Sequence, residues 1–505
     1  MKEIKENVIK AAESLQLSPI EFYDASIQKI QDTSALLIKT SRGRRLVFIG
    51  PCEMFTGDKV DIGKISMTVC KLTHENAVAL RKLFPWTGPN PVGLKTSFGA
   101  GDRIGVATPG HIRGLKPYDV VPVLAQQSIR EMTRTGRTPE EVMDDATWAV
   151  FQEGYTEGFG SDADHLKTGQ DIRNTVAAGF TGFTVDPSDH INNEADTMET
   201  DPLQNAYHEL FDSSEEANAF LLKYSGKTAE IAGKRGNLKI TISEEDVKRL
   251  AVKYLPAIRH TIYGYDLLTR LMQNKSFDFE MSVDETETPT TVAAHYMVAR
   301  ELKDAGVKCT SLAPRFVGEF QKAVDYIGDV DEFRQHLQDH VTIAQHFGPY
   351  KISIHSGSDK FSIFPIVGQE TKGLFHEKTA GTSYLEALRV VARHDPELFR
   401  EIFYFAKTRF QEERHSYHVT TNMANVPNIT DVDNSDLEAL LDNDDTRQVL
   451  HITFGGTLTT QNNDGSYRFR DRMLDVLNEH EEDYYQFLET LFVKHAKAFE
   501  IKKKA

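Results

Sequence analysis

The clearest structural signal in the chain lies in the stretch Lys351-Ile-Ser-Ile-His355-Ser-Gly-Ser-Asp-Lys360. Ile352 and Ile354 alternate with polar residues, which predicts a short buried strand. The strand leads directly into a histidine and then into a loop of serine and glycine. A parallel β/α barrel presents metal ligands and anion-binding loops in this way, at the carboxyl ends of its strands. The stretch therefore favours an α/β barrel with a polar site near His355.

A second stretch, Gly160-Ser-Asp-Ala-Asp164-His165-Leu-Lys167, places an acid directly beside a histidine. The pair stands one residue before a lysine, and a predicted helix follows. Together the two stretches indicate a metal site that handles an anionic, oxygen-rich small molecule.

Strand and helix patterns alternate through most of the chain. Helices are predicted to begin after the capping residues Thr138, which precedes a proline, and Ser243. Strands are predicted at residues 92–94, 103–107, 180–185, 277–283, 307–312, 351–354 and 449–453. Alternation of this kind implies a parallel sheet, and the spacing suits a (β/α)8 TIM-type barrel.

The barrel is expected to occupy residues 91–505, with a separate α+β subdomain at residues 1–90. Prolines and glycine between residues 85 and 91 mark the boundary, because these residues break regular structure. The polar and acidic stretches 190–240 and 425–447 are predicted to be insertions in the barrel.

The overall charge and the cysteines narrow the class of protein. The 505 residues carry a formal net charge of -17, which argues against a nucleic-acid partner because phosphate neutralisation needs a basic face. The cysteines are three and scattered, so a reducing compartment fits best. The amphipathic N-terminus is not a secretory signal, and no apolar run is long enough to span a bilayer. We therefore expect a cytoplasmic protein with no membrane partner; the oligomeric state is left open.

Asp164, His165 and His355 are the first candidates for chemistry. In the functional interpretation both histidines bind a divalent metal, while Asp164 is a base for a substrate hydroxyl or C–H group. A catalytic metal needs about three protein ligands, and two histidines with a carboxylate are a common set. The structural alternatives are a hydrogen-bonded histidine at a sheet edge and a solvated aspartate in a turn.

Two carboxylates are candidates for the remaining roles. Strand alternation places Asp278, Glu280 and Ser282 on one face, which in a barrel would be the lumen. Buried there with a partner, Glu280 is expected to have a raised pKa suited to donating a proton. The alternative is a strand exposed on one side. Glu319 follows a Pro-Arg turn and suits a metal ligand on a loop, or else the first turn of a helix.

The cations that could bind a substrate carboxylate are Lys167, Arg315, Lys360 and Lys378. Each alone is weak, because most lysines of an acidic protein are solvated. The glycine loop at residues 99–105 misses the dinucleotide-binding spacing by one residue and is not followed directly by a helix. No nucleotide cofactor is therefore expected.

Five motifs carry a family resemblance: GAGDRIGVATPGHIRG (99–114), DADHLKTGQDI (162–172), FDFEMSVDETETPT (277–290), APRFVGEFQ (313–321) and SIHSGSDKFSIFP (353–365). Together they resemble the tagaturonate/fructuronate epimerase family, metal-dependent enzymes of bacterial hexuronate breakdown. The resemblance covers most of the chain. The motifs around His355 and Asp164 are its most specific parts.

The resemblance implies roles for individual residues. It implies Asp164 as proton acceptor, Glu280 as proton donor with Glu285 as the alternative, and His165, Glu319 and His355 as ligands of a divalent cation. Lys167, Arg315 and Lys360 are then the predicted contacts to a ketohexuronate substrate. Mixed nitrogen and oxygen ligation admits Zn, Mn, Ni, Co or Fe, so the metal is not determined.

The implied reaction constrains the mechanism. Tagaturonate and fructuronate differ at a carbon one removed from the α position, so enolisation at the ketone cannot invert it. Either a cofactor oxidises the hydroxyl transiently, or the neighbouring C–C bond breaks and re-forms in a retro-aldol step. The second is favoured, and it needs a metal, a base and an acid. A class II aldolase, a ketose isomerase and a non-catalytic sugar-acid-binding protein are the alternatives.

Overall fold

A closed barrel of parallel strands forms the centre of the computed structural model, which describes residues 2–30, 32–233, 236–379 and 381–504. Within these residues the strands follow one another around the barrel in chain order, and the last pairs with the first. They are β7 (Ser97–Ala100), β8 (Val121–Ser128), β9 (Gly160–Leu166), β10 (Gly182–Val185), β13 (Asp278–Val283), β14 (Ser311–Pro314), β15 (Lys351–Ile354) and β16 (Phe375–Thr379). The predicted (β/α)8 TIM-type barrel is confirmed.

Helices follow the strands and cover the outside of the barrel. They are α3 (Thr108–Leu115), α4 (Ile129–Thr135), α5 (Pro139–Gln152), α6 (Gly169–Ala178), α9 (Glu244–Met272), α10 (Val292–Asp304), α11 (Val330–Phe347), α12 (Phe364–Thr371) and α13 (Thr382–His394). The predicted caps are present: the side chain of Thr138 accepts a bond from the Glu141 N–H, and that of Ser243 from the Asp246 N–H. Among the described helices, none combines the length and apolar character needed to cross a bilayer.

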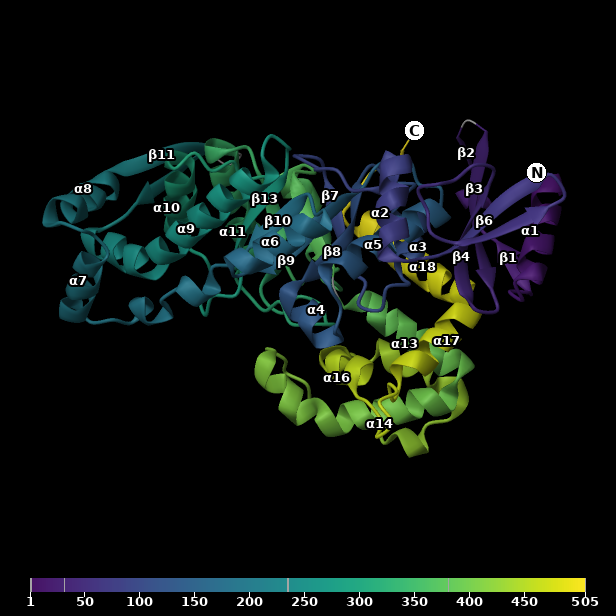
Figure 1. Cartoon of the computed structure of the whole chain (residues 1–505). Coiled ribbons are helices and arrows are strands. Elements are labelled where there is room, and N and C mark those ends of the chain that lie inside the picture. The colour runs from purple at the N-terminus through teal and green to yellow at the C-terminus, as the bar shows by residue number, and fades with distance from the viewer. Residues whose placement is uncertain (1, 31, 234–235, 380, 505) are drawn as a thin grey trace.

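An antiparallel sheet lies beside the barrel at the N-terminal end of the chain, purple in Figure 1. This part comprises α1 (Lys2–Ser14), β1 (Ile20–Phe22), β2 (Gln28–Ile30), β3 (Thr33–Thr40), β4 (Gly43–Ile49), β5 (Asp58–Ile62), β6 (Ile65–Lys71) and α2 (His74–Leu83). One face of the sheet packs on α1. The other shares a core with Phe151 of α5, whose ring stacks on Trp86 with the centroids 5.8 Å apart. Aromatic contacts therefore attach the sheet to the barrel.

Two insertions extend away from the barrel (Figure 1). The first, between β10 and α9, contains α7 (Thr200–Glu209), α8 (Ser214–Tyr224) and the hairpin of β11 (Thr228–Gly233) and β12 (Gly236–Thr241). The second follows α13 and contains α14 (Pro396–Glu413), α15 (Asp444–Ile452), α16 (Phe454–Thr459) and α17 (Arg470–Glu479), with an apolar core of its own.

The last helix, α18 (Glu481–Ala498), returns to the barrel and packs along α3. The approach is close, since a Cβ atom on Gly110 or Gly114 would lie 2.7 Å from a side-chain atom of α18. Phe98 of β7 packs edge-on against Phe492 and Phe499 at the end of the chain. The C-terminal segment thus covers the outer face of the first barrel strand.

Four strand predictions are wrong or displaced. Residues 449–453 belong almost entirely to α15; residues 446–452 are all buried, and an apolar run buried on every side does not distinguish a strand from a helix. The predicted strands at 92–94 and 103–107 are loops on either side of β7, which contains only small residues apart from Phe98. The strand predicted at 307–312 is displaced, because β14 begins at Ser311.

Replacing Phe151 by alanine should lower the melting temperature and loosen the N-terminal sheet. The buried ring belongs to the core that the N-terminal sheet shares with α5, and removing such a ring typically costs about 3–5 kcal/mol. Thermal unfolding measures the loss, and limited proteolysis should cut first within residues 2–83. Tyr404→Ala is the matched control, because its ring is exposed. Equal melting temperatures for the two variants would contradict this role of Phe151.

Candidate active site

Asp164 and His165 lie at the carboxyl end of β9. Adjacent residues of a regular strand point to opposite faces. Here, however, His165 has a positive φ of 54°, and its Nδ1 lies 3.0 Å from Oδ1 of Asp164. A left-handed conformation is costly for a residue with a Cβ atom and is characteristic of functional sites. This turn of the backbone brings both side chains to the same end of the barrel.

His355 directly follows β15 and is buried against the same site. Its Nε2 lies 2.7 Å from Oε1 of Glu280, and its Nδ1 lies 3.2 Å from Oδ1 of Asp284. The rings of His165 and His355 have their centroids 5.2 Å apart. The structure thus brings together four of the residues singled out by the sequence, Asp164, His165, Glu280 and His355.

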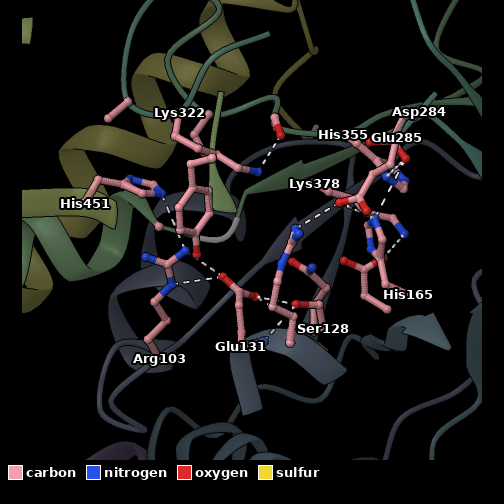
Figure 2. A pocket seen from close by; sticks show the side chains of 18 residues that line it. Arg103, Ser128, Glu131, His165, Asp284, Glu285, Lys322, His355, Lys378 and His451 are labelled. Atoms are coloured by element: carbon pink, nitrogen blue, oxygen red, sulfur yellow. Dashed lines mark hydrogen bonds and ion pairs between the residues drawn. The ribbon is translucent and has the colours of Figure 1, made fainter. Parts of the chain in front are cut away.

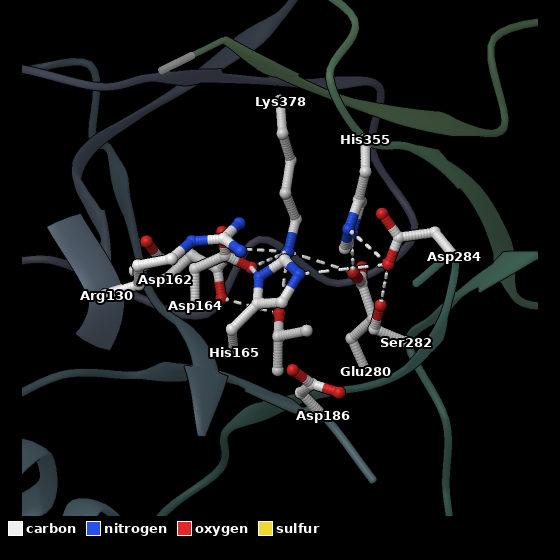
Figure 3. A network of polar contacts seen from close by, with 12 residues as sticks. Arg130, Asp162, Asp164, His165, Asp186, Glu280, Ser282, Asp284, His355 and Lys378 are labelled. Atoms are coloured by element: carbon white, nitrogen blue, oxygen red, sulfur yellow. Dashed lines mark hydrogen bonds and ion pairs between the residues drawn. The ribbon is translucent and has the colours of Figure 1, made fainter. Parts of the chain in front are cut away.

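Lys378 of β16 lies at the centre of the site. Its Nζ is 2.7 Å from Asp162, 2.8 Å from Asp164 and 2.9 Å from Glu280 (Figure 3). The ammonium also donates to the Thr184 hydroxyl. Asp162 and Asp164 come from β9 and Glu280 from β13, and Lys378 joins them across the lumen of the barrel.

Burial would raise the pKa of Glu280, but Lys378 and His355 hold it well below its usual range. The expectation of a raised pKa for Glu280 is therefore corrected: the sequence did not reveal that a lysine from β16 reaches it. Burial would also raise the pKa of Asp164. His165 and Lys378 outweigh this effect, so the pKa of Asp164 is lowered as well.

The two imidazoles show the opposite shift. Burial alone would lower their pKa values, but nearby carboxylates raise that of His165 to about 10 and that of His355 to about 9. Asp164 is the principal partner of His165, and Asp284 that of His355. Both rings therefore lie where negative charge stabilises a cation.

A divalent cation fits this arrangement. Among the described residues, Asp164, His165 and His355 have ligand atoms within 4.8 Å of one another, as do His165, Asp186 and Glu285. Both ring nitrogens of His165 and Nδ1 of His355 are buried and make no hydrogen bond of good geometry within the described chain. Nitrogen and carboxylate donors of this kind suit a first-row divalent metal.

The predicted ligand Glu319 lies outside both groups of ligand atoms. Its carboxylate contacts Nε2 of His418 at 2.5 Å, and its side chain is 40% exposed. It lines a cavity over the mouth of the barrel together with His355. Asp284 is closer to both histidines. It was not predicted from the sequence, although it stands four residues after Glu280.

The predicted substrate cations have other partners. Lys167 pairs with Asp189 at 2.7 Å, and Arg315 donates to the backbone carbonyl of Thr286. Lys360 is fully buried and donates to the carbonyl oxygen of Gln321 at 2.7 Å, so it supports a loop from beneath the cleft. Of these, Arg315 lines the outer cleft.

The cleft consists of two adjoining cavities over the barrel mouth. Both are lined by Arg130, Asp284, Glu285, Lys322, His355, Ser356 and Tyr417. The inner cavity reaches down to Asp164, His165 and Lys378, and it extends to Arg103, Glu131 and His451 on the other side (Figure 2). Arg130, Lys322 and Tyr417 were not found from the sequence, because none stands in a strand, although Lys322 directly follows the motif at residues 313–321.

A (β/α)8 barrel with ionised acids, paired imidazoles and a buried lysine at the carboxyl ends of its strands has the organisation of a barrel enzyme for a small polar molecule. Comparison with known proteins identifies its family. The model of the UxaE family, tagaturonate epimerase, matches residues 23–499. The chain belongs to this family.

Individual relatives agree over nearly the whole chain. The tagaturonate/fructuronate epimerase of Thermotoga maritima is 41% identical over 483 residues, covering 95% of this chain and 97% of the relative. The native crystal structure of the fructuronate-tagaturonate epimerase UxaE from Cohnella laeviribosi is similar with a TM-score of 0.92 at 40% identity. It covers 99% of this chain and 100% of that one, as does a glycerol complex with a TM-score of 0.91.

Lys378→Met should destabilise the protein in a pH-dependent way. Without the ammonium, three buried carboxylates lose their cation, and breaking a buried ion pair in this way costs about 3–5 kcal/mol. Their folded pKa values then rise relative to the wild type, so stability relative to the wild type is lost as the pH rises above about 4 and regained as it falls. Melting temperatures from pH 4.5 to 7.5 measure the effect.

Lys360→Met is the matched control for that series, because this buried ammonium donates only to backbone carbonyls among the described residues. Its loss should lower the melting temperature equally at each pH in this range. A pH-independent loss in Lys378→Met as well would contradict the role given to the three carboxylates.

Proposed function

We propose that the protein is an isomerase that interconverts D-tagaturonate and D-fructuronate by a metal-dependent retro-aldol reaction. The observation that carries the proposal is the meeting of Asp164, Glu280 and Lys378 beneath one cleft in a chain of this family. An ionised base, a second carboxylate and an ammonium between them suit a reaction that removes a proton and later returns it.

His165 and His355 would hold the metal, with Glu319 or Asp284 as the carboxylate ligand. When bound, a divalent cation supplies positive charge that stabilises the oxygen of a ketone as it becomes negative. Asp284 already lies beside both imidazoles, whereas Glu319 reaches them only by leaving His418.

Asp164 accepts the proton of the hydroxyl on the carbon to be inverted. Its lowered pKa keeps it ionised, which is the state an acceptor requires. Loss of this proton turns the hydroxyl into an aldehyde as the neighbouring C–C bond breaks. The electron pair of that bond passes to the ketone fragment, and the aldehyde turns its other face before the bond re-forms.

Glu280 returns a proton to the alkoxide when the bond is re-formed. It is ionised at rest and must first acquire that proton. Lys378 lies 2.8 Å from Asp164 and 2.9 Å from Glu280, so its ammonium can donate a proton to Glu280 and, as the neutral amine, take up the proton that Asp164 has accepted. The proton thus passes between the two acids through Lys378, with no net change of charge.

The activity is tested by incubating the purified protein with Mn²⁺ or Zn²⁺ and tagaturonate, and following the products by NMR. Fructuronate should form until equilibrium is reached, and chelation should stop the reaction. Net formation of trioses would instead assign an aldolase. Binding without turnover in the presence of metal would assign a sugar-acid-binding protein.

Asp164→Asn and Glu280→Gln should each retain metal and substrate binding but lose turnover by about 10²-fold or more, the usual size of an acid–base contribution. The amides preserve shape but transfer no proton. Activity is followed over pH 5 to 10, together with metal content. Full turnover in Glu280→Gln, with loss in Glu285→Gln, would transfer the donor role to Glu285.

His355→Ala should abolish stoichiometric metal binding while the circular dichroism spectrum is kept, because a site of about three ligands loses most of its affinity with one. Glu319→Ala should weaken metal binding by at least about 10-fold. His418→Ala, which frees the Glu319 carboxylate, is the matched control and should keep the metal. Retention of metal in Glu319→Ala, with loss in Asp284→Ala, would reassign the third ligand.

A further inference from the structure

Lys322 differs from every other cation of the inner cavity in lacking a carboxylate partner. It lies between β14 and α11 and lines both parts of the cleft. Its Nζ donates to the Ser356 hydroxyl at 2.5 Å, and among the described residues no carboxylate oxygen lies within ion-pairing distance. Lys378, by contrast, has three carboxylates, and Arg103 has Glu131.

Arg130 adds a second positive charge to the cleft, and its partner Glu285 also lies 3.7 Å from Nε2 of His165 (Figure 3). Arg130 stands at the start of α4, lines both cavities, and has one ion pair with Glu285, in which its own side chain is 40% exposed. Burial and the nearby Arg130 both lower the pKa of Lys322. Lys322 and Arg130 thus place two positive charges on the lining of both cavities.

The cleft therefore has two chemically different sides. Figure 2 shows Lys322 entering the cavity on one side and His165 with Lys378 on the other. The imidazoles and acids suit the ketone and hydroxyl groups of a sugar. Lys322 and Arg130 together suit a carboxylate, since an ammonium and a guanidinium bind one through charge-assisted hydrogen bonds.

We propose that Lys322 and Arg130 bind the carboxylate of the sugar acid and retain the carboxylate-bearing fragment while the C–C bond is broken. This inference rests on the proposed epimerase function. In a ketohexuronate the carboxylate and the ketone stand near opposite ends, on opposite sides of the bond that breaks. The aldehyde fragment carries the carboxylate and is held at that end alone.

Anchoring at the carboxylate serves the inversion. The aldehyde must turn its other face to the ketone fragment, a rotation about single bonds that a fixed carboxylate permits. Without the anchor the aldehyde leaves the cleft, and the enzyme releases trioses in place of the epimer. Lys322 and Arg130 are thus specificity-determining residues for the acid.

The test compares a charged with a neutral substrate. Lys322→Met and Arg130→Met should raise KM for tagaturonate by about 10-fold to 100-fold, the usual range for one hydrogen bond to a charged group. Neither should change kcat/KM for D-tagatose, in which a hydroxymethyl group replaces the carboxylate, by more than about threefold. Lys322→Arg should restore part of the loss, and the methionine variants should release more triose per turnover.

Lys494→Met is the control, since it removes an exposed lysine that lies over the ring of Phe361, away from the cleft. A second measurement does not depend on turnover. D-glycerate, a three-carbon hydroxy acid, should bind the wild-type protein at least about 10-fold more tightly than it binds Lys322→Met by calorimetry, while glycerol should not discriminate.

Equal losses for tagaturonate and D-tagatose, or equal glycerate binding by wild type and variant, would overturn the carboxylate site and leave the epimerase function standing. Absence of fructuronate with the wild-type protein would overturn the epimerase function instead. The glycerate measurement would then still decide whether Lys322 binds a carboxylate.

Discussion

The ammonium of Lys378 is the interaction on which the site depends. Three carboxylates that would repel one another in the lumen are held within 3 Å of it, at positions fixed by β9, β13 and β16. The lumen of a barrel is ordinarily filled by branched apolar side chains, and charges there carry a desolvation cost. That cost is offset only while the barrel stays closed, because closure sets the strand positions. The ionised state of the acids therefore depends on closure of the barrel.

Local patterns in the sequence predicted the barrel and half of the site. Alternation through residues 277–283 placed Glu280 in the lumen, and His355 was expected at the end of its strand; both are found there. What local patterns could not supply is distance across the barrel. Lys378 is far from Asp164 in the chain, and only closure joins them. The same reason explains why Lys322 and Asp284 were missed and why the pKa of Glu280 was expected to rise.

Backbone strain at the mouth of the barrel could not be predicted either. His165, Ala323, Ser356 and Asp359 all have positive φ without being glycine, and they lie at the carboxyl end of a barrel strand or in a segment that follows one. A conformation that is unfavourable for residues with a Cβ atom persists only when the surrounding structure holds it in place. At His165 it aims two neighbouring side chains at one point, and at Ser356 it presents the hydroxyl that Lys322 reaches.

The packing of α18 on α3 has a consequence for the order in which the protein can be made. A ribosome completes the eighth barrel strand at residue 379, but the ring of Phe98 on the first strand packs against Phe492 and Phe499, which are made later. Until those residues leave the exit tunnel, the nascent chain exposes an aromatic surface on an otherwise formed barrel. Such surfaces are prone to aggregation. The barrel is therefore fully covered only after α18 has been synthesised and has packed on α3, and the nascent chain is a natural client for a chaperone until then.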